Sequence, residues 1–149
     1  MKRVRNLLIR LDEALLAADA VLNESQPANP GKIRIIWEKR PNGKRPQVVE
    51  WKRNRKLEWY PTRVSHKGLS KRAKSRVGFK LNHARVVEIL EVVGWLMELR
   101  VACMRKIAAV ERSDVLTERE NLPRIAAHLE LIARVGRSSR EALRTKGVG

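Results

Sequence analysis

The stretch KIRIIWEKRPNGKRPQVVEWKRNRKLEWYPTRV, residues 32–64, decides the fold of this chain. Three runs rich in Ile, Val, Trp and Tyr are separated by the turn-forming segments PNGK and RNRK, which is typical of an antiparallel β-meander. A three-residue turn at residues 42–44 would pair Trp37 with Val49. A two-residue Asn-Gly turn would instead move each side chain of the second strand to the opposite face of the sheet. We expect the former, because it places Ile33, Ile35, Trp37, Val49, Trp51, Leu57 and Trp59 on one apolar face and Arg34, Ile36, Glu38, Val48, Glu50, Lys52, Glu58 and Tyr60 on the other.

Helical periodicity flanks the meander on both sides. Apolar residues recur at steps of three and four from Val4 to Leu22, and again from Lys80 to about residue 112, while Pro123 suits the start of a last helix that ends at Gly136. The pattern predicts an α+β fold, a bundle of three main helices with the meander inserted after the first, and the second helix as the centre of the core. We expect a single domain over residues 1–149, divided into an N-terminal helix (1–24), a linker (25–32), the basic meander (33–64), an exposed basic arm (65–78), a helical hairpin (79–136) and a frayed C-terminal tail (137–149).

Positive charge is concentrated in the middle third of the chain. Residues 31–80 carry 17 Lys and Arg against three carboxylates, so they hold +14 of the net charge of +17. Such a field repels itself, and a polyanionic partner, most commonly nucleic acid, is its best explanation. The most apolar stretch, residues 86–104, contains four charged side chains, which argues against a membrane span.

Catalytic and metal-binding patterns are incomplete. Glu50-Trp51-Lys52 resembles half of a metal-dependent nuclease motif, but the preceding Asp is missing, and a surface charge pair is the simpler interpretation. The three histidines lack metal-ligand spacing, and Cys103, the single cysteine, suits a small core residue. We therefore expect no catalytic residue, no metal and no cofactor.

The tryptophans allow two interpretations. Trp37, Trp51 and Trp59 could form a platform on which unpaired bases stack, or they could pack against the helices as the core of the sheet. A three-stranded sheet needs one covered face, so we expect at least two of the three in the core. Tyr60 is the better candidate for contacting a partner.

The sequence thus predicts a cytoplasmic, non-catalytic protein that binds DNA or RNA through phosphate contacts and does not bind membranes. The helices would serve as scaffold, and as an interface for a homodimer or a protein partner. Two alternatives are a subunit of a larger ribonucleoprotein or conjugation-type nucleoprotein complex, and an inhibitor that covers an acidic protein surface. The predicted nucleic-acid-binding residues are Arg40, Lys44, Arg45, Lys52, Arg53, Arg55, Lys56, Tyr60, Arg63, Lys67, Lys71, Arg72, Lys74 and Arg76.

Overall fold

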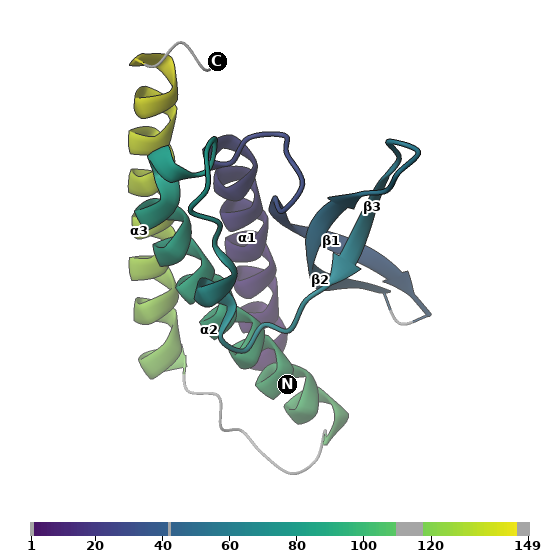
Figure 1. The fold of residues 1–149 in the computed structure, drawn as a ribbon. Helices are drawn as coiled ribbons and strands as arrows, with labels where there is room; N and C mark the ends of the chain where they lie inside the picture. Colours follow the sequence, from purple (N-terminus) through teal and green to yellow (C-terminus); the bar gives the residue numbers. More distant parts are fainter. Residues whose placement is uncertain (1, 42, 110–117, 146–149) are drawn as a thin grey trace.

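The computed structural model describes residues 2–41, 43–109 and 118–145 and confirms the α+β fold. Helices and sheet form two layers, with the three-stranded sheet beside the helical bundle (Figure 1). No helix within these ranges combines the length and the apolar character needed to cross a bilayer. In chain order the elements are α1 (Lys2–Ser25), β1 (Ile33–Arg40), β2 (Gly43–Arg53), β3 (Trp59–Arg63), the short 3-10 helices η1 (Leu69–Arg72) and η2 (Lys80–Asn82), α2 (His83–Ala108) and α3 (Glu118–Thr145).

Helix α1, and not α2 as the sequence suggested, is the centre of the structure. It contacts α2, α3 and β1, whereas α2 and α3 contact each other only slightly. Its apolar positions therefore face three directions, and residues such as Leu7, Leu11 and Leu15 are fully buried. The wide stripe of apolar residues on α1 is explained by this central place.

The register of the sheet differs from the expected one. Arg40 pairs with Gly43, so only two residues lie between the paired ends of β1 and β2, and residue 42 itself lies outside the described residues. Ile35 consequently pairs with Val48, and the two pack into the core with Ile33. Trp37 pairs with Pro46, three residues before the expected Val49. Because strand side chains alternate, this shift by an odd number of residues moves Val49 and Trp51 to the outer face and turns Val48, Glu50 and Lys52 toward the helices.

The pairing of β2 with β3 extends this arrangement. Arg53 pairs with Trp59, Trp51 with Pro61, and Val49 with Arg63. These six residues share the side of the sheet that faces away from the helices, and we call them the outer sheet face. The expected single apolar face is therefore wrong, and apolar side chains lie on both sides of the sheet.

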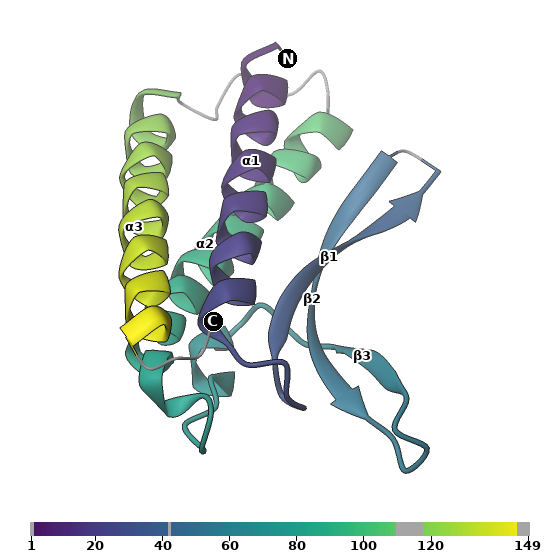
Figure 2. The ribbon, with the colours of Figure 1, turned by 90° about the horizontal axis from the view of Figure 1, so that it is seen from above.

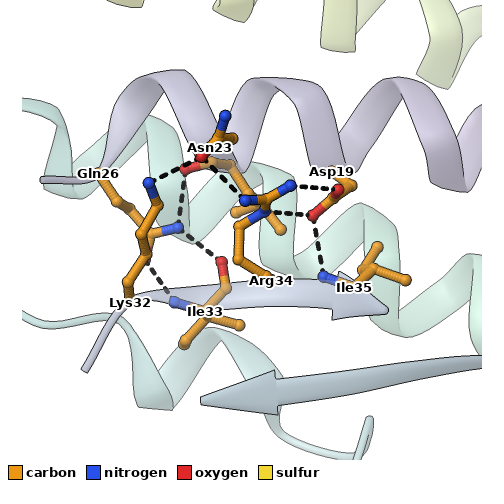
Figure 3. Close-up of polar contacts among 8 residues, drawn as sticks. Asp19, Asn23, Gln26, Lys32, Ile33, Arg34 and Ile35 are labelled. Carbon is orange, nitrogen blue, oxygen red and sulfur yellow. Dashed lines mark hydrogen bonds and ion pairs between the residues drawn. The ribbon is translucent and has the colours of Figure 1, made fainter. Parts of the chain in front are cut away.

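The free edge of β1 is closed by polar side chains of α1 and of the residue after it (Figure 3). Gln26 accepts a hydrogen bond from the Ile33 N–H at 3.0 Å and donates to the Ile33 carbonyl at 2.8 Å. Asp19 accepts from the Ile35 N–H at 2.9 Å and binds the guanidinium of Arg34 through both of its oxygens at 2.8 Å. This hydrogen bond to Asp19 raises the pKa of Arg34. The N–H and C=O of Ile33 and the N–H of Ile35 thus have hydrogen-bond partners without a fourth strand.

Two glycines allow elements to approach closely. A Cβ atom on Gly136 would lie 3.1 Å from a methyl carbon of Val21, so a glycine lets α3 pack tightly against α1. A Cβ on Gly94 would lie 3.1 Å from the carbonyl oxygen of His66, where the chain crosses α2. We had expected Gly136 to end the last helix. It lies inside α3 instead, where the missing side chain lets this helix pack against α1.

Helix α3 is longer than predicted. It begins at Glu118, continues through Gly136 and ends at Thr145, so most of the expected tail is helical. The buried Val135 and Ser139 lie on either side of Gly136, which shows that this part packs onto the fold. For α2, the expected extension to residue 112 reaches beyond the described residues, which show the helix to Ala108.

An aromatic contact joins α2 to α3. The rings of Trp95 and His128 lie 4.9 Å apart, and the guanidinium of Arg124 lies 4.3 Å from the centre of the Trp95 ring. Burial, and then the charge of Arg124, lower the pKa of His128. His128 is therefore a packed interface residue, neutral at physiological pH.

Removing the side chain of Gln26 tests the closure of the β1 edge. We expect Gln26→Ala to lower the free energy of unfolding by about 2–3 kcal/mol, because it leaves the buried N–H and C=O of Ile33 without partners. Denaturant unfolding measures this loss. Glu13→Ala, at an exposed position of α1, should change stability by less than about 0.5 kcal/mol. Equal midpoints of denaturant unfolding for the two variants would show that the hydrogen bonds of Gln26 to Ile33 do not stabilise the edge of the sheet.

Candidate nucleic-acid interface

The predicted basic residues gather in three places. Arg40, Lys44 and Arg45 lie at the tip of the β1–β2 hairpin, and Lys52, Arg53, Arg55 and Lys56 lie in and beside the β2–β3 turn. The third group, Lys67, Lys71, Arg72, Lys74 and Arg76, lies in the segment that connects β3 to α2. This segment starts away from the tip of the β1–β2 hairpin, because Arg63, the last residue of β3, pairs with Val49 in the middle of β2.

Some of these cations are bound to carboxylates and others are not. Glu38 bridges Arg40 at 3.0 Å and Arg63 at 2.7 Å, and Lys74 lies 2.6 Å from Glu50. Among the residues that the structure describes, no carboxylate forms an ion pair with the remaining predicted cations. Those available for a partner are Lys44, Arg45, Lys52, Arg53, Arg55, Lys56, Lys67, Lys71, Arg72 and Arg76.

The outer sheet face combines aromatic and cationic side chains. The Trp59 side chain is 43% exposed, and the guanidinium of Arg53 lies 5.3 Å from the centre of its ring. Arg53 also donates to the carbonyl of Leu57 at 3.3 Å, which fixes it beside the turn. Trp51, half-buried, occupies the next cross-strand pair with Pro61. An exposed indole beside a held guanidinium offers a flat, positively charged surface.

The structure corrects the expectation for the tryptophans. Trp37 packs against the hydrophobic core, but Trp51 and Trp59 lie on the outer sheet face and belong to no part of that core. Fewer than two of the three are therefore core residues. Tyr60 is also exposed, at 43%, and it pairs with Lys52 on the opposite side of the same strands. The β2–β3 turn projects beyond the helices, which leaves both sides of this end open (Figure 1).

The basic arm is anchored to the fold and is not an exposed tether. Leu69 and Phe79 are buried, and η1 lies against α2. Lys74 reaches Glu50 of β2, and Arg76 donates to the carbonyl of Pro30 and lies 5.2 Å from the centre of the Phe79 ring. Within the arm, Lys67, Lys71 and Arg72 remain exposed and free of ion pairs in the described structure.

A cleft that the sequence did not reveal lies between the β1–β2 hairpin and the helices. Its volume is about 620 Å³, and residues of α1, β2, α2 and the segment after β3 line it. Arg40, Lys44 and Arg45 line it on the hairpin side, and Arg100 and Arg105 line it on α2. Arg100 was the available signal, because it is the one basic residue within the most apolar stretch of the chain, residues 86–104, and its side chain is nearly buried.

The residues considered for chemistry have structural partners. Glu50 faces the helices and is bound to Lys74, and Lys52 lies on the same side of β2. Burial raises the pKa of the Cys103 thiol to about 11, which keeps it protonated and unreactive at neutral pH. In the described ranges, His, Cys, Asp and Glu side chains form no group of three that could hold a metal ion.

A comparison of the chain with protein-family models, with curated proteins and with solved structures finds no match to any of them.

The ion pair between Lys74 and Glu50 predicts different roles for neighbouring lysines. Lys74→Ala should lower the free energy of unfolding by on the order of 2 kcal/mol, because the Glu50 side chain is only 9% exposed and would lose its cation. Adding Glu50→Gln should recover part of this loss. Lys71→Ala, at an exposed position, is the matched control and should leave the thermal midpoint unchanged. Equal effects of the two lysine variants would contradict the anchored arm.

Proposed function

We propose that the protein binds single-stranded segments of RNA or DNA through its outer sheet face, and that it catalyses no reaction on them. The observation that carries the proposal is the exposed indole of Trp59 with the Arg53 guanidinium 5.3 Å from its ring centre, next to Trp51 on the same face. Every nucleobase has a π-face, so an indole and a guanidinium plane can stack with it whatever its sequence.

The surrounding charges suit the sugar–phosphate backbone of the same strand. Lys52, Arg55 and Lys56 surround the β2–β3 turn, and no carboxylate binds them in the described structure. Glu58, the carboxylate of this turn, accepts a hydrogen bond from Asn54 at 3.0 Å. Cations that no carboxylate binds are available to phosphates, and they contribute affinity without reading sequence. The proposed contact therefore combines stacking on the sheet with phosphate binding at the turn.

Exposed aromatic side chains favour a single strand over a duplex. In a duplex the faces of the bases are stacked within the helix, so an indole cannot reach them without opening the pairs. A sheet that leaves Trp59 43% exposed on its surface instead suits bases that are already unpaired. Binding to duplexes with equal affinity would point to phosphate contacts alone.

Replacing Trp59 tests the stacking contact directly. Trp59→Ala should weaken binding of a 12-nucleotide single strand by about 1–3 kcal/mol, a loss of roughly 5- to 150-fold. Fluorescence anisotropy of a labelled oligonucleotide in fixed salt measures it, and Trp59→Phe should restore part of the affinity. Leu16→Ala removes another exposed apolar side chain, on α1, and should leave binding unchanged. Wild-type affinity in folded Trp59→Ala would refute the platform.

The exposed arm cations predict a salt dependence. Replacing Lys67, Lys71 and Arg72 together by Ser removes three candidate phosphate contacts, so the slope of log K against log salt should become shallower by about 2 for a single strand. The thermal midpoint should stay near that of the wild type, because all three side chains are exposed. An unchanged slope would show that the strand does not follow the arm.

A further inference from the structure

The cleft between the β1–β2 hairpin and the helices lies apart from the outer sheet face. In Figure 2 the tip of the hairpin stands across from the C-terminal end of α2 and the N-terminal end of α1. The space between them holds a cavity of about 620 Å³, which is within the range of roughly 300–1,000 Å³ typical of small-molecule sites. It opens on the helix side of the sheet, so a ligand there would not compete with a strand on the outer face.

The floor of the cleft is apolar. Val48 and Val64 come from the sheet and the segment that follows it, and Met97, Val101 and Met104 come from one side of α2. Met104 is 42% exposed, so this part of the floor is open to a ligand. Methionines adapt their shape to different apolar groups, so this floor can accommodate an alkyl chain or a ring.

The walls of the cleft are positively charged. Arg40, Lys44, Arg45, Arg100 and Arg105 line it, against one carboxylate, Asp12, among the described lining residues. The Arg100 side chain is 10% exposed, and its Nε donates to Asp12 at 2.7 Å. That bond uses one of the five N–H donors of the guanidinium and fixes its position. Lys44, Arg45 and Arg105 form no ion pair in the described structure, so an anion entering the cleft meets uncompensated cations.

We propose that this cleft binds a small free amphiphilic anion, an alkyl or aryl group that carries a carboxylate, phosphate or sulfonate. The apolar part lies on the floor formed by Val48, Val101 and Met104, and the charged end lies among Lys44, Arg45 and Arg105. A nucleic-acid strand does not fit this description, because the polar edges of its bases would find no hydrogen-bond partner on the floor formed by Val48, Val101 and Met104. The site is therefore a second one, independent of the proposed strand-binding face.

Titration calorimetry on the full chain tests the proposal with ligands of matched chain length. Dodecanoate, kept below its micelle concentration in 150 mM salt, should saturate at one molecule per chain. Decanoate should bind about tenfold more weakly, because two methylene groups fewer are buried. Dodecyltrimethylammonium, with the same chain and the opposite charge, should bind at least tenfold more weakly than dodecanoate.

Paired charge variants separate the cleft from the general positive field. Lys44→Ser with Arg45→Ser should weaken dodecanoate binding by about tenfold, whereas Arg55→Ser with Lys56→Ser, the same change of charge in the other turn, should leave it unchanged. Val101→Glu should abolish binding in a protein whose circular dichroism shows it folded. The oligonucleotide affinity of the Lys44 and Arg45 variant serves as a separate readout for the outer face.

Four results would overturn the proposal. They are equal losses from the two charge pairs, equal binding of the anion and the cation, binding to anionic vesicles but not to monomeric dodecanoate, and binding of an acidic amphipathic peptide with no binding of dodecanoate. Equal losses from the two charge pairs would show that the anion binds through the overall charge of +17. Binding to vesicles alone would indicate that the cleft binds a membrane, and binding of the peptide alone would indicate that it binds a protein partner. None of the four bears on the stacking contact of Trp59.

Discussion

The structure depends on the contact between the polar side chains of α1 and its C-terminal end and the open edge of β1. Asp19 and Gln26 provide hydrogen bonds that a neighbouring strand would otherwise supply to Ile33 and Ile35. The sheet is thereby held beside the helices at its first strand, and its outer face is exposed at Trp59, whereas Val49 on the same face is buried. A sheet attached at its edge can expose one face while the other contributes Ile33, Ile35 and Val48 to the core.

The sequence predicted the type and order of the elements, because hydrophobic period and turn residues are local signals. It could not determine which side chains of β2 face the helices, since this depends on whether two or three residues form the first turn. A difference of one residue in the turn moves every side chain of β2 to the other face of the sheet. The basic arm was predicted to be exposed and the last helix to end at Gly136 for a similar reason. Leu69 lies in η1, which packs against α2, and Gly136 packs against Val21 of α1. Both contacts join residues that are distant in the sequence, so a local pattern does not reveal them.

Charge and apolar surface are combined twice in this fold, in two different ways. On the outer sheet face, flat rings lie open beside cations, a combination that suits planar groups arriving from solvent. In the cleft, a concave apolar floor lies below cations, which suits a chain with a charged end. The prediction of the phosphate-contacting residues used charge alone, so it grouped Lys44 and Arg45 with Arg53 and Arg55. In the structure Lys44 and Arg45 line the cleft, whereas Arg53 and Arg55 lie at the β2–β3 turn.

The position of Pro61 in the last strand sets a limit to the growth of the sheet. Val64 directs its N–H to Val48, so alternation along the chain points the nitrogen of Pro61 away from β2, toward the open side. Proline has no hydrogen to donate there, and a further strand arriving from another molecule would meet a gap in its ladder. Pro61 therefore makes this edge of the sheet a poorer template for a strand of another molecule.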